Sequence, residues 1–354
     1  FQSAGLDIQE FPLYKSNMAK GDYSVYMWPN PHGTNQAISF NQSYNVDPAL
    51  GKLVRTTAFR QALSYAVDRE AIRDTYFIGV GRPSAGAPNP KDGFYPGDAV
   101  ANKFSVTDLA KAGALLDGIG LTDTDGDGYR NYAGGKNVIL WAQLAVREMP
   151  MWELLVSDFK NVGIRLDLKE GSGHELMRTA KQPIGAAGLT SITESSMTGV
   201  GPCMASYGPP NCPLIAKYIA TGGKQGHGPS PNSAYLPTAP AGAYPEDATG
   251  VIKQVQDLWK TGKSNPPGSA ARLAAGKEIN TLWMEQQFSI GTVQGASGDR
   301  DVYMKRNNFR NPPILARARG FYGAWAETYY FEDGKDNVNN PGNRSKKYKS
   351  TSFR

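Results

Sequence analysis

One segment of the sequence, residues 138–168, restricts the possible fold more than any other. Residues 138–144 form an apolar run typical of a strand, and residues 151–162 repeat apolar side chains at helical spacing before Gly163. Residues 164–168 then alternate apolar and polar side chains with period two. A strand, a helix and a second strand in this order form a β-α-β unit with parallel neighbouring strands. The segment therefore predicts an α/β protein.

Helical spacing of apolar residues also predicts elements on both sides of this unit. One helix should start near Phe59 and end by Gly79, and another should open at Ser105, with Asp108 completing a capping box. Two helices are predicted after residues 250 and 267, and strands over 37–41 and 288–293. Residues 191–245 are rich in Gly, Pro, Ser and Thr, which indicates a long functional loop or a surface elaboration.

Ligands of open α/β sheets bind beyond the carboxyl ends of the strands. The loop after residue 144 carries Arg147 and Glu148, and we expect it to form one wall of a site. Aromatic side chains without an assigned helical face are the best candidates for flat contacts to a ligand. Those aromatic candidates are Trp141, Tyr207, Tyr322 and Trp325.

The formal charge of +6 is concentrated at the end of the chain. Six basic residues and one acidic residue lie between Lys335 and Arg354, so this polar tail carries +5 and the rest of the chain carries +1. A solvated tail explains this distribution better than a nucleic-acid surface, and no nucleic-acid partner is predicted. The chain starts at Phe1 without a basic and apolar leader, so we expect a signal peptide to be either absent or already removed.

The two cysteines, Cys203 and Cys212, lie in a Gly/Pro-rich segment. In an oxidising compartment they would close a small loop as a disulfide, which we favour because such a loop has little else to order it. In a reducing compartment they would remain two thiols.

Motifs of known catalytic sites are missing from the sequence. The chain has His32, His174 and His227, but Arg178 stands where a zinc-binding helix starting at His174 needs its second histidine. A Ser/His/Asp site assembled from distant positions stays open, as does a hydrolase that uses Glu148 and Glu194 as acid and base. We predict that the chain is not an enzyme.

Carboxylates alternate in one short loop, as they do in calcium-binding loops. Asp123, Asp125 and Asp127 precede Gly128, but the twelfth position of the loop is Gly134, where calcium needs a bidentate glutamate. The simpler interpretation is a tight turn in which Asp and Gly favour the backbone conformation. No cofactor is predicted, and calcium is the one candidate.

Several segments, in order, resemble the family 5 extracytoplasmic solute-binding proteins of ABC importers, the oligopeptide, dipeptide and nickel type. The strongest is 59–72, which reads FRQALSYAVDREAI, followed by 115–129, which reads LLDGIGLTDTDGDGY. The others are Gly135-Lys136, DFKNVGI at 158–164, IGTV at 290–293 and NPP at 311–313.

This resemblance implies a type II periplasmic-binding fold, of which the chain holds one complete lobe and part of the other. It assigns residues 1–45 and 289–331 to the first lobe, 46–288 to the second lobe and 332–354 to the polar tail, and it implies that an N-terminal portion is missing. It further implies a solute held between lobes that close by a hinge motion, an ABC transporter membrane permease as partner, and a periplasmic or lipid-anchored cell-surface location.

The resemblance also bears on the ligand, a peptide or an oligosaccharide. Peptide binders of the family place an aspartate after the strand that follows the β-α-β unit, where it pairs with the α-ammonium of the ligand. The corresponding stretch here, AGLTSITESS at 187–196, contains Glu194 and no aspartate. This favours a neutral oligosaccharide, with Glu194 as a ligand contact or a solvated loop acid. A structural or interaction module, suggested by the basic tail and the Gly/Pro-rich segment, is the remaining alternative.

Overall fold

The computed structural model divides into two compact units. Unit 1 consists of Phe1–Pro29 and Ser297–Arg354, and unit 2 of Asn30–Ala296. The units divide at 29/30 and 296/297, and the strands near both points pair inside unit 2. The lobe boundaries expected at 45/46 and 288/289 stay a prediction. The structure describes residues 6–27, 33–34, 36–44, 46–187, 190–197, 212–220, 250–295, 302–310 and 330–331.

Unit 1 is built on a pair of antiparallel strands, β1 (Tyr23–Met27) and β11 (Val302–Arg306). The rings of Tyr26 and Tyr303 stack at 4.9 Å between centroids and join the two distant chain segments. Its other described elements are η1 (Ile8–Glu10), α1 (Phe11–Ser16), α2 (Met18–Gly21), β12 (Phe309–Arg310) and β13 (Tyr330–Phe331).

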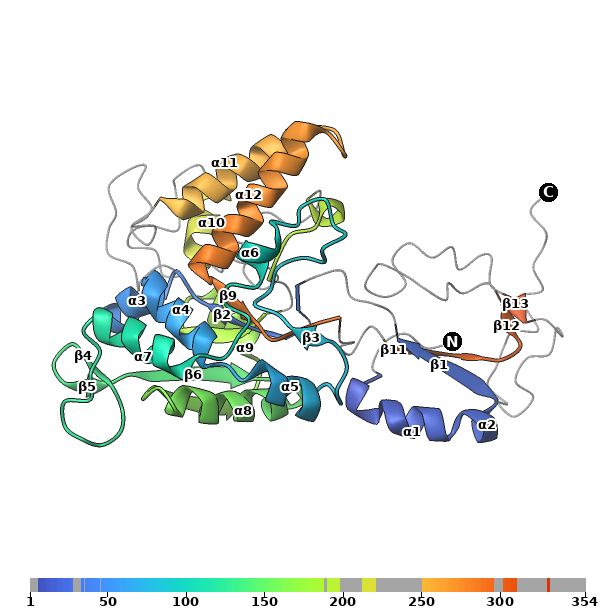
Figure 1. Ribbon diagram of the computed structural model, residues 1–354, viewed down its shortest axis with the longest axis horizontal. Coiled ribbons are helices and arrows are strands. Elements are labelled where there is room, and N and C mark those ends of the chain that lie inside the picture. Colours follow the sequence, from blue (N-terminus) through green and yellow to red (C-terminus); the bar gives the residue numbers. More distant parts are fainter. Residues whose placement is uncertain are drawn as a thin grey trace. The chain divides into compact units, whose positions relative to one another are not determined.

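The predicted β-α-β unit is confirmed in unit 2. Strands β6 (Ile139–Leu144) and β7 (Arg165–Glu170) are parallel and paired over six residues, and α8 (Met149–Lys160) connects them (Figure 1). Along β6 every second residue is fully buried. Helix α8 buries the side chains of Trp152, Leu155 and Phe159, which accounts for the apolar spacing of this segment.

A second sheet contains strands from three distant parts of unit 2. Strand β2 (Ala37–Phe40) lies between β8 (Ile184–Ala187) and β9 (Ser289–Gly291), antiparallel to both. The side chain of Gln182, which is fully buried, links this sheet to β6: its Oε1 accepts a hydrogen bond of 3.0 Å from the Gln143 amide.

A layer of helices covers another part of unit 2. Helices α11 (Val251–Ser264) and α12 (Ala270–Gln286) lie side by side, with α10 (Pro213–Ala220) next to them (Figure 1). They enclose an apolar cluster that includes Phe94, Val255 and Trp283. The remaining described elements of unit 2 are α3 (Pro48–Arg55), α4 (Thr57–Ala66), α5 (Arg69–Thr75), α6 (Asp98–Ala101), α7 (Leu109–Gly118), α9 (Gly173–Arg178), η2 (Val146–Glu148), η3 (Glu194–Ser196), β3 (Arg82–Pro83), β4 (Asn131–Tyr132), β5 (Lys136–Asn137) and β10 (Val293–Gln294).

Two predicted helix boundaries were wrong. The helix expected to run from Phe59 to Gly79 is broken into α4 and α5, because Val67 is extended and the Asp68 carboxylate accepts a hydrogen bond of 3.0 Å from the Ala71 amide. Helix α7 begins after Asp108 rather than at Ser105, with the Asp108 carboxylate accepting from the Lys111 amide. In the described ranges no helix is both long and apolar enough to cross a bilayer.

Two arginines in the core donate hydrogen bonds to backbone carbonyls, including those of distant segments. Arg60 donates to the carbonyl oxygens of Gln286 at 2.8 Å and Val54 at 3.0 Å. Arg69 donates to the carbonyl oxygens of Gly291 at 3.0 Å and Ser64 at 2.8 Å. Each is about 1% exposed, and burial lowers the pKa of each guanidinium to about 9, which leaves it charged at neutral pH. These arginines hold helix and strand ends where the sheet and the helices meet.

Asp158 makes the stability of unit 2 depend on pH. Burial raises the pKa of its carboxyl to about 6, although the Asp68 amide donates a hydrogen bond of 3.0 Å to it. The folded state therefore holds this proton more tightly than the unfolded chain, so the contribution of Asp158 to stability is greatest below about pH 4 and falls as the pH rises towards 6.

We predict that Asp158→Asn removes this dependence, because the amide oxygen still accepts from Asp68 and cannot ionise. In urea unfolding, the free energy of unfolding of wild type should fall between pH 4 and 7 by about 1–3 kcal/mol more than that of the variant. Glu278→Gln, at an exposed acid on α12, is the matched control and should follow wild type. Parallel profiles for wild type and Asp158→Asn would contradict the account.

Candidate ligand-binding site

Trp141, the aromatic candidate on β6, already has partners within the protein. Its indole N–H donates a hydrogen bond to the hydroxyl of Tyr44, whose pKa is raised by burial. The ammonium of Lys169 lies 5.6 Å from the centre of its ring. The side chain is half-buried, so part of the ring is exposed. Its role as a ligand platform stays a prediction.

The loop after β6 is closed by its own acid. Glu148 Oε2 accepts a hydrogen bond of 3.2 Å from the Ala145 amide, which fixes the turn at η2. Arg147 is exposed, and its carbonyl oxygen accepts a hydrogen bond of 3.2 Å from the Tyr76 hydroxyl. The Arg147 side chain is thus placed at the surface beyond the end of β6, as the sequence predicts, and its contact to a ligand stays a prediction.

Glu194 is hydrogen-bonded through its carboxylate, its amide and its carbonyl oxygen. Its Oε1 accepts a hydrogen bond of 2.6 Å from the Gly268 amide, just before α12. Its own amide donates to Asp92 Oδ1 at 3.2 Å, and its carbonyl oxygen accepts from Arg272 Nη2 at 3.1 Å. These bonds give Glu194 a structural function, joining the loop after β8 to the start of α12.

One of the two cysteines lies within the part that the structure describes, whereas several other candidates do not. Cys212 is fully buried against the helical layer. The candidates outside the described residues are Tyr207, Tyr322, Trp325 and Cys203, together with His32, His227 and the side chain of His174. The pairing of Cys203 with Cys212 and the Ser/His/Asp alternative both stay untested.

The loop that follows β8 is held by side chains that sequence reasoning missed. Asn280 on α12 donates hydrogen bonds to the carbonyl oxygens of Ile192 at 2.9 Å and Phe94 at 3.0 Å, and accepts one of 3.1 Å from the Ile192 amide. Thr190 and Ser191 are buried and bond to distant backbone groups. No local pattern could have found these contacts, since 88 residues separate Asn280 from Ile192.

An open groove of about 500 Å³ lies between α3 and residues 119–135. Tyr132 lines it and donates a hydrogen bond of 2.8 Å to Asp47 Oδ2, and burial raises the pKa of the Tyr132 hydroxyl. Asp47 also accepts from the amides of Ala49 and Leu50 and so caps α3. The polar groups beside this groove therefore already serve the helix cap.

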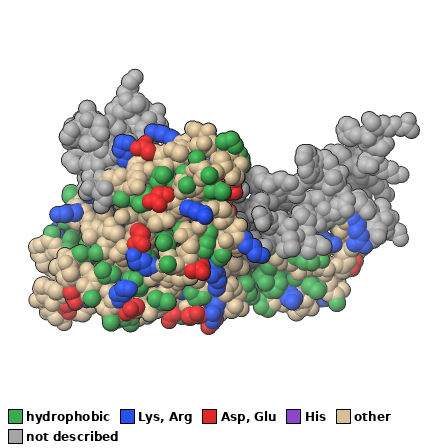
Figure 2. Space-filling view, turned by 45° about the horizontal axis from the view of Figure 1, so that its top comes forward, with side chains coloured by type: hydrophobic (Ala, Val, Ile, Leu, Met, Phe, Trp, Pro, Cys, Tyr) green, Lys and Arg blue, Asp and Glu red, His purple; other side chains and the backbone are tan. Residues whose placement is uncertain are grey.

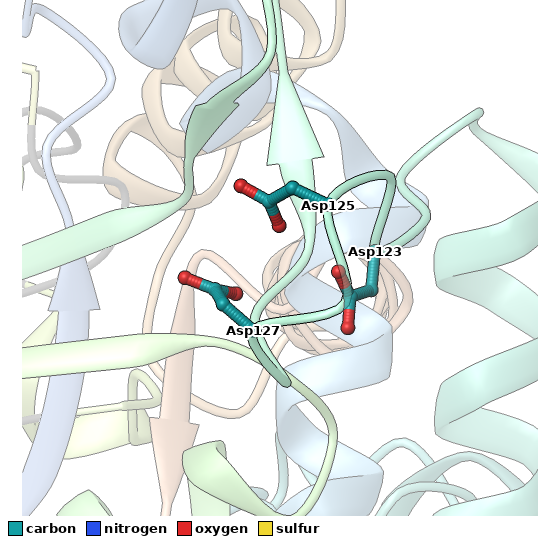
Figure 3. Close-up of side chains that lie close together, drawn as sticks. All are labelled: Asp123, Asp125 and Asp127. Atoms are coloured by element: carbon teal, nitrogen blue, oxygen red, sulfur yellow. The ribbon is translucent and has the colours of Figure 1, made fainter.

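Asp123, Asp125 and Asp127 come together, as their alternation predicts. Each offers a carboxylate oxygen within 4.8 Å of the others, and all three are exposed (Figure 3). Asp123 accepts hydrogen bonds from the amides of Gly128 at 2.9 Å and Gly126 at 2.7 Å, which hold the pKa of its carboxyl below the usual range. The Asp123 carboxylate therefore stabilises the backbone of this turn.

We expect calcium to leave the stability of the protein unchanged, because Gly134 supplies no carboxylate at the twelfth position. The melting temperature measured in calcium and in EDTA should agree within about 1 °C. A higher melting temperature in calcium than in EDTA, lost in Asp125→Asn, would show a metal site instead.

Charges are mixed over the visible face of unit 2. Figure 2 shows lysine and arginine side chains interspersed with acidic ones across its described part. This agrees with the near-neutral body inferred from the sequence.

Comparison with known proteins identifies relatives of the chain. A family model described as bacterial extracellular solute-binding proteins, family 5 Middle, matches residues 1–202. The periplasmic alpha-galactoside-binding protein of Rhizobium meliloti is 30% identical over 122 residues, which is 30% of this chain and 16% of that protein.

Solved structures share the fold. The oligopeptide-binding protein OppA matches with a TM-score of 0.65 and 21% identity, over 87% of this chain and 47% of that one. MelB of Agrobacterium fabrum C58, in complex with stachyose, matches with a TM-score of 0.64 and 19% identity, over 95% and 49%. AppA of Bacillus subtilis, in complex with a nonapeptide, matches with a TM-score of 0.62 and 15% identity, over 92% and 55%.

The chain thus spans about half the length of the solved structures that it matches. The match shows the type II periplasmic-binding fold expected from the sequence, and this chain corresponds to one lobe and part of the other. Because the family model covers more than half of the sequence, the chain belongs to family 5 of the bacterial extracellular solute-binding proteins.

Proposed function

We propose that this chain is part of a receptor that captures an uncharged oligosaccharide and delivers it to an ABC importer. The observation that carries the proposal is the loop after β8. It contains no aspartate, and its one acid, Glu194, is bonded to the Gly268 amide. A peptide's ammonium therefore lacks the carboxylate that peptide binders of the family supply there.

Two relatives support this ligand class. One is named for binding alpha-galactosides, and MelB was solved with stachyose, a neutral oligosaccharide. OppA and AppA, named for oligopeptides, keep a peptide as the competing ligand. Aromatic side chains such as Trp141 and the hydroxyls of a polar loop suit sugar rings, which combine apolar faces with hydrogen-bonding edges.

The mechanism that we propose is binding by closure. The chain passes between units at 29/30 and 296/297, and the segments that follow and precede these points contain β2 and β9. These strands pair directly, with Ile38 opposite Ile290. We propose that a ligand that contacts both lobes favours the closed form. Closure breaks no covalent bond.

The proposed setting follows from the family. A receptor of this kind works outside the cytoplasmic membrane, in the periplasm or anchored to the cell surface by lipid, and docks on the membrane permease of its importer. The alternative use of Glu148 and Glu194 as hydrolytic acid and base fits less well, because each carboxylate already accepts a hydrogen bond from a backbone amide, Glu148 from Ala145 and Glu194 from Gly268.

The ligand class is tested by isothermal titration of the full-length protein with stachyose and with a tetrapeptide that has a free amino end. We expect stachyose to bind with a Kd in the micromolar range, about −8 kcal/mol, and the peptide to give no heat. Chromatography of the mixture should recover stachyose intact. Preferential binding of the free peptide, or cleavage of stachyose, would overturn the proposal.

Glu194→Gln separates a structural glutamate from a ligand contact. The amide oxygen of glutamine still accepts from Gly268, so stachyose affinity should change less than about threefold, that is by less than about 1 kcal/mol. Glu194→Ala removes the bond and should lower the free energy of unfolding by about 1–2 kcal/mol. A loss of peptide binding in Glu194→Gln would instead show that the acid pairs with an ammonium.

A further inference from the structure

Gly86 lies where three segments of unit 2 meet. A Cβ atom on Gly86 would stand 2.6 Å from Thr190 Cβ, in the loop after β8. A Cβ on Gly33 would stand 1.8 Å from the Gly86 carbonyl oxygen, and one on Gly291 would stand 2.6 Å from the Gly86 nitrogen. Gly86 also has φ +116°, which L side chains rarely adopt. Only glycine therefore permits this junction.

The segments that meet there include both connections to unit 1. Unit 2 begins at Asn30 and ends at Ala296. The first connecting segment, residues 33–40, leads through Gly33 into β2, and the second connecting segment, residues 289–295, contains β9 and β10. The third segment at the junction is the loop after β8, where we place the ligand.

Buried hydroxyl groups tie the loop after β8 to the junction. Thr190 Oγ1 donates a hydrogen bond of 2.8 Å to the Gly86 carbonyl oxygen. Ser191 Oγ accepts one of 3.2 Å from the Gly33 amide. Both residues are at most 2% exposed, so no solvent replaces these partners. The loop is thus bonded directly to the first connecting segment and, through Gly86, to residues 84–87.

Residues 84–87 are bonded in turn to the second connecting segment. The Gly291 amide donates to the Ala85 carbonyl oxygen at 3.1 Å, and the Ser84 amide donates to the Thr292 carbonyl oxygen at 3.0 Å. The two connecting segments are also joined to each other, because the Thr292 amide donates to Thr34 Oγ1 at 3.1 Å. A displacement of the loop therefore reaches both connections through hydrogen bonds.

We propose that Thr190 and Ser191 are positioning residues that couple the ligand loop to both connecting segments, with Gly86 as the junction. They act by holding backbone groups of unit 2 in place rather than by contacting the ligand. The inference rests on the proposed function only in taking this loop as part of the ligand site. It explains why hydroxyl side chains are buried at two successive positions beside a strand end, where their unmade bonds would be costly.

Hydrogen exchange of the full-length protein without ligand tests the coupling. Thr190→Val and Ser191→Ala should each speed amide exchange about fivefold in the connecting segments. For Thr190→Val the decisive segment is 289–295, because the Thr190 hydroxyl makes its hydrogen bond to Gly86 and not to that segment. Thr190→Ser keeps the hydroxyl and should restore wild-type exchange. Thr107→Val is the matched control, since Thr107 Oγ1 also donates at 2.8 Å to a carbonyl oxygen, that of Val67.

Stachyose supplies the second arm. In wild type it should slow exchange in the loop and in both connecting segments, whereas in Thr190→Val it should slow exchange in the loop alone and bind about tenfold more weakly. Wild-type exchange at 289–295 in ligand-free Thr190→Val, or equal acceleration there in Thr107→Val, would overturn the coupling. Failure of wild type to bind stachyose would overturn the proposed ligand class, while the ligand-free exchange still decides the coupling.

Discussion

The pairing of β2 with β8 on one side and β9 on the other is the constraint on which the rest of unit 2 depends. Strand β2 is buried along its whole length, and its two partners come from positions about 145 and 250 residues later in the chain. This sheet places residues 37–39, near the start of unit 2, beside residues 289–291, near its end. Strand β8 brings the proposed ligand loop to the same end of the sheet.

Polar side chains buried in unit 2 serve mainly to hold backbone in place. Gln182 joins the central sheet to the β-α-β unit, Asn280 holds the loop after β8, and Arg69 bonds to the end of β9. A buried polar group is costly unless its hydrogen bonds are made, so each of these contacts specifies a single arrangement of the segments it joins. The Glu194 carboxylate likewise holds a backbone group, the Gly268 amide. For this reason we propose a neutral ligand rather than a charged one.

The sequence predicts what depends on short periodicity, and it misses what depends on distance. The β-α-β unit was predicted because alternating burial in β6 and the helical stripe of Trp152, Leu155 and Phe159 are local patterns. The break at Asp68 was missed because buried apolar residues continue on both sides of it, with Val67 before the cap and Ile72 after it. The contacts of Thr190 and Ser191 were also missed, since their partners lie 104 and 158 residues away. Trp141 lies on the predicted strand and Arg147 in the loop that follows it, as their local sequence predicted.

We propose a neutral oligosaccharide as the cargo of this receptor, and the ligand that the protein retains on gentle purification decides between an oligosaccharide and a peptide. Native mass spectrometry of the full-length protein, followed by release and fragmentation of the bound molecule, identifies that ligand. We expect a mass and fragments built from hexose units, without an amino end. A retained peptide with a free α-ammonium would rule out the oligosaccharide.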